Sequence, residues 1–413
     1  MKKSKARGWC RRFAVCGRVA VGLVFGGWCA RAADPVVSNV RALQRPGTQL
    51  VEITYDVADP DSTSVSISVS VSDTGGATYT VPAATFSGAV GPNVTPGRGK
   101  RIVWDAGRDW PGKFSANVRF KVTAEDTAPA PQGMVLIPAG SFLMGDTFNE
   151  GYSDERPLHS VYVSAFYMDR TEVTKALWDE VYGWAVIHGY TFDNAGSGKA
   201  LDHPVHYVNW YDCVKWCNAR SEKEGRVPAY YRDAAQTLVY RAGRVDVQNE
   251  WVKWNAGYRL PTEAEWEKAA RGGLSGKRFP WGDTISHDQA NYYSVSGYSY
   301  DVSPTRRYHP TYAVGETPYT SPVGTFGANG YGLYDMAGNV WEWCWDRYGS
   351  GYYGSSPSSD PRGPSGGSGR VIRGGGWGYD AGRCRVAYRD SGWPDIRGII
   401  SDGGFRSVLP PGQ

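Results

Sequence analysis

The sequence predicts an α+β protein in two parts, an all-β sandwich followed by a larger α+β domain with little regular secondary structure. In the first part, apolar and polar residues alternate with period two, which is typical of strands with one buried face. In the second part, three amphipathic stretches begin at helix-capping residues. The remainder of that part is dense in glycine, tyrosine and tryptophan, which favours loops pinned by large apolar side chains.

Residues 1–32 have the composition of a secretory signal peptide. They contain eight lysines and arginines and no acid, and a mostly apolar run from Phe13 to Cys29 leads to Ala30-Arg31-Ala32. Arg18 interrupts this run, whereas a membrane-spanning helix needs about 20 uninterrupted apolar residues. Removing the eight positive charges turns the formal charge of +4 into −4, which gives no support for a nucleic-acid surface. We therefore expect an exported protein with no membrane span.

Residues 34–124 are predicted to form the sandwich. The alternation is clearest in Val51–Val57, Val65–Val71 and Val118–Val122. A small antiparallel sandwich of immunoglobulin or fibronectin type is the natural interpretation. Because it contains no catalytic constellation, we expect it to be a spacer or an adhesive module. The proline-containing segment 125–132 is predicted to be a short, stiff linker.

The second domain is predicted to cover residues 133–408. Its helices are expected to run from a cap at Thr174 through Trp184, from a cap at Asn209 to about Gly225, and from a cap at Thr262 to Gly272. Glu265 completes a capping box with Thr262. Beyond Gly273 the chain is predicted to be mainly loop and short strand.

The segment from Asn329 to Trp343 organises this domain. It combines glycine, aromatic residues and two acids without helical or strand periodicity, so we expect side chains and backbone carbonyls to hold it. Asp335 and Glu342 flank a tight Met-Ala-Gly-Asn turn. Together with the carbonyl oxygens of Gly338 and Val340, they would form an all-oxygen shell, which suits Ca²⁺. The alternative is a turn whose acids cap backbone amides or pair with arginine.

Five blocks of the domain carry a resemblance to a known family. They are Gly-Met-Val-Leu-Ile-Pro-Ala-Gly-Ser-Phe from Gly133, Arg-Leu-Pro-Thr-Glu-Ala-Glu-Trp-Glu from Arg259, Gly-Leu-Tyr-Asp-Met-Ala-Gly-Asn-Val-Trp-Glu-Trp from Gly332, Arg-Gly-Gly-Gly-Trp from Arg373, and Gly404-Phe405-Arg406. In this order they resemble the formylglycine-generating enzyme (sulfatase-modifying factor) family. The resemblance implies a C-type-lectin-like α+β fold with little regular secondary structure.

The resemblance also implies an activity, the copper-dependent oxidation of a substrate cysteine to formylglycine. The family uses two closely spaced cysteine thiolates, which hold the soft ion Cu(I). Counted forward from Gly374-Gly375-Gly376, the first thiolate position is Tyr379 in this sequence. Cys384 matches the second position in only one register. One thiol cannot form a two-thiolate site. Cys384 is therefore a candidate catalytic residue only under the alternative hypothesis of an active oxidoreductase.

Further site residues follow from the same resemblance. It places Trp341 and Arg389 in the substrate cleft and makes Asp335, Gly338, Val340 and Glu342 calcium ligands. A second calcium site would use Asn291 and the carbonyl of Tyr292. The later ligands of that second site fall across an insertion at residues 294–319 and are not placed.

From Gly374 to Arg406 the chain has a second likeness. Its pattern of Gly-Gly-x-Trp, Cys-Arg-x-Ala-Tyr-Arg and Gly-Phe-Arg resembles the variable C-terminus of lectin-fold target proteins of diversity-generating retroelements, in which changeable residues lie between fixed ones. Mixed aromatic and polar residues on a rigid frame suit a recognition surface. The predicted ligand-binding residues are Trp341, Trp377, Tyr379, Asp380, Arg383, Tyr388, Arg389, Asp390 and Trp393. The alternative is an ordinary loop of the parent family.

Four cysteines lie beyond residue 32, at Cys213, Cys217, Cys344 and Cys384. In an oxidising compartment they could form up to two disulfides, and buried free thiols are the alternative. The family resemblance brings the segments of Cys344 and Cys384 together, the latter in a strand predicted over Arg383–Tyr388. A Cys344–Cys384 bridge is therefore implied.

The leading functional hypothesis is an exported, calcium-supported binding protein on this scaffold, without the two-cysteine copper site. Its ligand would be a protein, a peptide or a glycan. An active oxidoreductase that uses copper is one alternative. A structural surface component, whose working part is the sandwich, is the other.

Overall fold

The computed structural model describes residues 35–59, 64–126, 131–395 and 402–411, and it divides into two compact units, residues 1–127 and 128–413. The predicted signal peptide lies outside the described residues. The predicted linker begins too early by two residues, because strand β7 continues to Asp126, which pairs with Val65. Within the described chain, no helix is both long and apolar enough to cross a bilayer.

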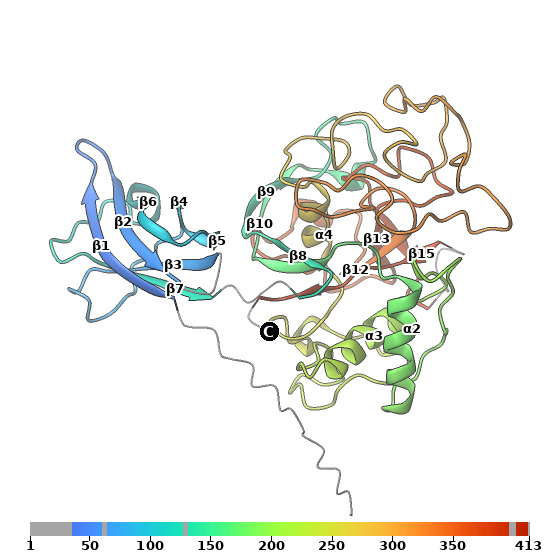
Figure 1. The fold of residues 1–413 in the computed structure, drawn as a ribbon, viewed down its shortest axis with the longest axis horizontal. Helices are drawn as coiled ribbons and strands as arrows, with labels where there is room; N and C mark the ends of the chain where they lie inside the picture. Colours follow the sequence, from blue (N-terminus) through green and yellow to red (C-terminus); the bar gives the residue numbers. More distant parts are fainter. Residues whose placement is uncertain (1–34, 60–63, 127–130, 396–401, 412–413) are drawn as a thin grey trace, which may run out of the picture. The chain divides into compact units, whose positions relative to one another are not determined.

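The first unit consists of two antiparallel sheets, as the alternating pattern predicts. Their strand orders are β1-β2-β6-β4 and β5-β3-β7 (Figure 1). The elements are β1 (Val36–Gln44), β2 (Leu50–Ala58), β3 (Val65–Ser72), β4 (Phe86–Gly88), β5 (Gly91–Val94), β6 (Gly97–Asp105), α1 (Ala106–Asp109) and β7 (Arg119–Asp126). Side chains from both sheets share one apolar core, which includes Ile53, Ile67 and Trp104.

The second unit combines short strands with three longer helices (Figure 1). The helices are α2 (Lys175–Ile187), α3 (Trp210–Lys223) and α4 (Glu263–Ala270), and the 3-10 turns are η1 (Ser153–Glu155), η2 (Asn249–Trp251) and η3 (Tyr352–Gly354). The strands are β8 (Met134–Ile137), β9 (Gly140–Met144), β10 (His159–Val163), β11 (Phe166–Asp169), β12 (Trp341–Arg347), β13 (Arg370–Arg373), β14 (Asp390–Gly392), β15 (Gly403–Gly404) and β16 (Val408–Leu409). They form sheets of order β10-β9, β16-β11-β8 and β14-β13-β12-β15.

The three helices begin at the predicted caps. The side chain of Thr174 accepts a hydrogen bond from the amide of Leu177, and Asn209 caps α3 in the same way. Thr262 and Glu265 form the predicted capping box of α4. Each cap satisfies amides that the first helical turn leaves without a partner. The starts of these helices are therefore confirmed.

Tryptophans carry much of the core of this unit. The rings of Trp178 on α2 and Trp216 on α3 stack at 5.9 Å, and Phe405 meets Trp216 edge-on at 5.2 Å. Between Arg271 and Val340 the described chain contains no helix or strand. This long irregular stretch confirms the prediction of loops beyond Gly273.

Candidate ligand-binding site

The segment from Asn329 to Trp343 is held largely by single contacts to distant backbone groups, as predicted. The amide of Gly338 donates to the carbonyl of Gly374, and that of Asn339 donates to the carbonyl of Asn291, both at 2.8 Å. A Cβ on Gly338 would lie 2.3 Å from the Asn291 oxygen, and Gly338 has a φ of 85°. Only glycine meets both conditions. The end of the segment differs from the expectation, because Trp341 begins β12, an inner strand of its sheet.

The two acids of this segment have different partners. Arg406 binds both carboxylate oxygens of Glu342 at 2.7 Å, and the indole nitrogen of Trp266 donates to one of them. Asp335 accepts a hydrogen bond from the amide of Gly324 on Oδ2, while its buried Oδ1 has no hydrogen-bond partner. Glu342 is thus neutralised by arginine, and Asp335 is not.

A third buried carboxylate, that of Glu172, lies beside this pair. It accepts hydrogen bonds from Asn339 Nδ2 at 2.8 Å and from the amide of Val340 at 3.1 Å. Burial, and then the carboxylates of Asp335 and Glu342, raise the pKa of Glu172 well above its usual range. Burial also raises the pKa of Asp335 to about 6. Arg406 lowers the pKa of both Glu172 and Asp335, but burial and the neighbouring carboxylates outweigh it, so negative charge is in surplus here.

The predicted calcium ligands therefore fit the ion in part. The charge surplus and the unpartnered oxygen of Asp335 suit a hard cation, but both oxygens of Glu342 are already bound. Among the residues that the structure describes, no group of three or more His, Cys, Asp or Glu is arranged to hold a metal. At the second predicted site, Asn291 Oδ1 is buried without a partner, whereas the carbonyl of Tyr292 already accepts from His287 Nε2 at 3.1 Å. Calcium stays a prediction at both places.

The four described cysteines are free and buried, so the predicted Cys344–Cys384 bridge is wrong. The two thiols pack into different apolar clusters, Cys344 with Val371 and Cys384 with Phe279. The strand predicted over Arg383–Tyr388 is also wrong, because these residues form successive turns such as Cys384 N to Ala381 O. Cys213 and Cys217 lie one turn apart on α3 and have no bonded partner either.

Cys384 is poorly suited to metal or nucleophilic chemistry. Its side chain is fully buried, and burial raises the pKa of the thiol far above its usual value. The thiolate is the reactive and metal-binding form. At the other family position, the ring of Tyr379 stands edge-on to Trp341 at 5.2 Å, with the Arg383 guanidinium 5.4 Å from its centroid. An aromatic contact thus occupies the position predicted from the sequence to match the family's first thiolate.

A hollow of about 330 Å³ opens beside these residues. It is lined by Glu150, Gly151, Tyr152, Tyr298, Tyr300, Asp380, Gly382, Arg383, Arg385 and Tyr388. Tyr152 meets Tyr388 edge-on at 6.0 Å, and Tyr298 stacks on Tyr300 at 5.1 Å. Tyr152 is largely exposed and Tyr298 partly so, whereas Tyr300 and Tyr388 are buried in the floor of the hollow. Large, stiff, amphipathic side chains with charged neighbours suit recognition of another molecule.

Two of the charged pairs at this hollow help to fix its shape. Arg385 binds the buried carboxylate of Glu155 at 2.7 and 2.8 Å and so anchors the C-terminal segment to η1. Arg383 pairs with Asp380 at 3.1 Å and remains partly exposed. Three predicted binding residues, Asp380, Arg383 and Tyr388, are therefore brought together here.

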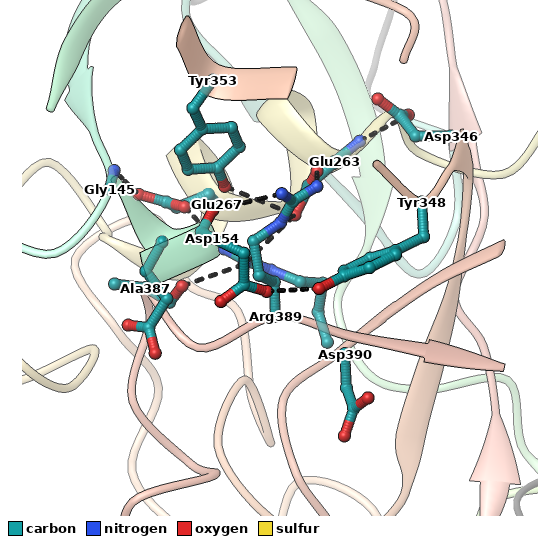
Figure 2. Close-up of polar contacts among 12 residues, drawn as sticks. Gly145, Asp154, Glu263, Glu267, Asp346, Tyr348, Tyr353, Ala387, Arg389 and Asp390 are labelled. Atoms are coloured by element: carbon teal, nitrogen blue, oxygen red, sulfur yellow. Dashed lines mark hydrogen bonds and ion pairs between the residues drawn. The ribbon is translucent and has the colours of Figure 1, made fainter. Parts of the chain in front are cut away.

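Arg389, which the sequence places in the cleft, is instead an internal structural residue (Figure 2). Its guanidinium binds both oxygens of Glu263 at 2.7 and 2.6 Å and donates to the carbonyl of Asp154 at 3.2 Å. Glu263 also accepts from Arg373 and from the hydroxyl of Tyr353, each at 3.3 Å. All of these side chains except Asp154 are almost fully buried. The prediction that Arg389 lines the ligand surface is wrong. Its side chain is buried, and its guanidinium is paired with Glu263 in the first turn of α4.

The remaining predicted binding residues do not line the hollow. Trp341 and Trp377 are buried, and Trp377 packs against Tyr308 and Tyr319 of the 294–319 insertion at 5.7 and 5.2 Å. Asp390 belongs to β14, and Figure 2 shows its carboxylate directed away from the Arg389 network. Trp393 is 58% exposed and lines none of the described hollow.

Sequence reasoning missed Tyr152, Tyr298 and Tyr300, since they come from segments far from the C-terminal pattern. It also missed Asp402, which lies next to Gly376. A Cβ at Gly376 would lie 3.1 Å from Oδ2 of Asp402, and burial raises the pKa of this carboxyl to about 8. Burial, and next the Asp402 carboxylate, raise the pKa of Tyr379. The insertion at residues 294–319 is a local signal for Tyr298 and Tyr300, which lie within it.

Comparison with known proteins gives four findings. Residues 119–410 match the family model of the sulfatase-modifying factor enzyme 1-like domain. The formylglycine-generating enzyme of Streptomyces coelicolor is 36% identical over 284 residues, which cover 64% of this chain and 85% of that protein. The chaperone protein LppX of Paenibacillus barcinonensis is 33% identical over 282 residues, with coverage of 67% and 88%. Among solved structures, Treponema denticola variable protein 1 is 33% identical with a TM-score of 0.51, and the match covers 67% of this chain and 95% of that protein.

Proposed function

The chain belongs to the sulfatase-modifying factor enzyme 1-like family, and from this premise we propose that it is an exported protein that binds a protein or peptide ligand. The observation that carries the proposal is the tyrosine-lined hollow formed by Tyr152, Tyr298, Tyr300 and Tyr388. Tyrosine and arginine are enriched in surfaces that recognise other proteins. Export is supported by the composition of residues 1–32.

The chemistry of the thiols supports binding rather than oxidation. Tyr379 stands at the first thiolate position, and Cys384 is buried with its proton retained at ordinary pH. Two relatives also have names that describe other roles, a chaperone protein and a variable protein. The variable protein supports the proposal that the residues between Gly374 and Arg406 are diversified to change the ligand.

The first unit completes this proposal. Seven strands in two antiparallel sheets around one core support an immunoglobulin- or fibronectin-type sandwich. It would act as a spacer or an adhesive module for the binding domain. A purely structural surface role would need the sandwich alone, so it leaves the tyrosine hollow without a purpose.

The binding proposal can be tested with a displayed library of random peptides, selected on the full exported protein. Peptides selected in this way are expected to lose at least about tenfold in affinity for Tyr152→Ala, because a rigid aromatic contact is removed from a recognition surface. Tyr152 is 63% exposed, so the substitution leaves the fold intact. Tyr388→Ala should weaken binding as well, and its melting temperature shows whether the fold has survived.

A matched control is Tyr162→Ala, which removes a partly exposed tyrosine of β10 that does not line the hollow. It should leave the affinity of the selected peptides unchanged. If the three variants bind the same peptides equally well, the hollow is not the ligand site. A protein that selects glycans and no peptide would overturn the ligand class.

The second candidate function is the oxidoreductase, favoured by the 36% identity to a formylglycine-generating enzyme. On our proposal, titration with Cu(I) shows no stoichiometric binding, because one buried, protonated thiol gives neither the charge nor the number of ligands that the ion needs. Cys384→Ala should then change nothing in the titration. Tight one-to-one Cu(I) binding that disappears in Cys384→Ala would revive the oxidase.

Calcium support is the last part of the proposal. A ligand that binds only the folded state stabilises it by about 2.7 kcal/mol at a concentration of 100 Kd. The melting temperature is therefore expected to rise with calcium and to fall with a chelator. Asp335→Ala should remove this shift, because Asp335 is the acid with an unpartnered oxygen. Glu180→Gln, at an exposed acid on α2, should keep it. An unchanged calcium shift in Asp335→Ala would exclude this ligand.

A further inference from the structure

A second hollow lies wholly within the first unit and belongs to no part of the function proposed above. Its volume is about 620 Å³, which lies within the range of about 300–1,000 Å³ for small-molecule sites. Its apolar wall includes Val40, Ala42, Val51, Trp104, Trp110 and Phe120. Trp104 is almost fully buried and meets Phe120 edge-on at 5.9 Å, so the wall is aromatic where it joins the core.

The hollow exists because β1 leaves the core partway along its length. The pairing of β1 with β2 shifts register between Ser38 and Arg41, and Asn39 in between has a φ of 54°. Such a bulge bends the strand. Val37, before it, packs against the core, whereas Val40 and Ala42, after it, line the hollow. The two sheets therefore share a complete core at one end and leave an apolar hollow that is open to solvent at the other.

The charge around this hollow has one sign. Lys113 and Arg119 line it, and no aspartate or glutamate does. Between described residues, neither cation takes part in an ion pair. The nearby carboxylate of Asp109 is already bound by the amides of Ala84 and Thr85 and by the indole nitrogen of Trp104. Arg119 donates to the carbonyl of Val118, at 2.9 Å. Two cations that pair with no described carboxylate, beside an apolar, aromatic space, complement a molecule with a long apolar body and an anionic end.

We propose that this hollow binds a long-chain carboxylate, a fatty-acid-like amphiphile. Its hydrocarbon chain lies between the β1 side chains Val40 and Ala42 and the rings of Trp104 and Trp110. Its carboxylate lies at the mouth, within reach of Lys113 and Arg119. Phe114, which also lines the hollow and is 88% exposed, is covered when the chain is bound.

The test uses the full chain and three probes of increasing length, octanoate, decanoate and dodecanoate, below their micellar concentrations. Calorimetry is expected to show one site per chain. Each added methylene should tighten Kd by about fourfold, the equivalent of burying one CH₂. Dodecanol and dodecyltrimethylammonium should bind at least tenfold more weakly than dodecanoate, because they lack the anionic end. Equal binding of all three dodecyl compounds overturns the proposal, and so does the absence of binding.

Two variants locate the site. Ala42→Trp fills the hollow and should abolish dodecanoate binding. The double variant Lys113→Glu with Arg119→Glu changes two exposed side chains, so it leaves the fold unaffected and should weaken dodecanoate at least tenfold. Lys121→Glu is the matched control, since Lys121 is exposed on the same strand as Arg119 and does not line the hollow. Dodecanoate binding that survives the double variant places the amphiphile elsewhere and overturns the assignment.

Discussion

Replacing Arg389 with methionine is expected to destabilise the second unit by about 3–5 kcal/mol, the usual cost of removing one partner of a buried ion pair. The side chains of Arg389 and Glu263 are both essentially inaccessible to water. Without the guanidinium, Glu263 keeps only one weaker contact from Arg373, at 3.3 Å, and a hydroxyl from Tyr353. The first turn of α4 and the segment before β14 would then lose the bond that joins them.

Urea denaturation followed by tryptophan fluorescence measures this change. Trp104 and Trp110 are the only tryptophans among the described residues of the first unit, so the signal reports mainly on the second. The control is Lys223→Met, because Lys223 pairs with the largely exposed Glu180. That surface pair should be worth less than about 1 kcal/mol. If Arg389→Met leaves the free energy of unfolding unchanged but abolishes ligand binding, Arg389 belongs to the binding surface after all.

Asp402→Asn is expected to stabilise the protein at alkaline pH by about 5 kcal/mol, since a change of one in pKa corresponds to about 1.4 kcal/mol, and this gain should shrink as the pH falls. The pKa of Asp402 is about 8 in the folded protein and 3.8 when unperturbed, because burial disfavours its charged form. Between these two values the folded state binds the proton more tightly than the unfolded state. Stability therefore falls as the pH rises from about 4 through 8. Asparagine does not titrate and removes this contribution.

The measurement is the free energy of unfolding of both proteins at pH 5, 7 and 9. The difference should be small at pH 5 and largest at pH 9. Asp233→Asn is a suitable comparison, since Asp233 is partly exposed and its pKa is lowered by the amide of Leu238. Its contribution is lost as the pH falls below about 4, so it should show no change between pH 5 and 9. If the difference in the free energy of unfolding between Asp402→Asn and the parent is the same at every pH, the raised pKa of Asp402 is contradicted.

The sequence predicts the local parts of the fold well. The starts of α2, α3 and α4 are confirmed because a cap involves residues only three positions apart, Thr174 with Leu177 for example. The long irregular region is also confirmed, since glycine and tryptophan density is a local property. Family resemblance adds the order of the blocks, which the match to the family model over residues 119–410 confirms.

The features that the sequence could not predict depend on contacts between residues that are far apart in the chain. Arg389 binds Glu263, which is 126 positions away in the sequence, and no local sequence pattern around either residue predicts this ion pair. The hollow joins Tyr152 to Tyr388, which are separated by more than half of the chain. The predicted Cys344–Cys384 bridge is wrong because the two thiols are packed in separate apolar clusters, although the family resemblance implies that their segments lie close together.

One sheet of the second unit sets a condition on how this unit is made. Strand β11 is flanked by β8, the first strand of the unit, and by β16, the last. The same end of the chain supplies Arg406 to Glu342 and Ser407 to Asp169. The core cannot close until residues near Leu409 have left the ribosome, since domains fold as units during synthesis. Up to that moment the nascent chain is loosely folded, and it is open to chaperones and proteases.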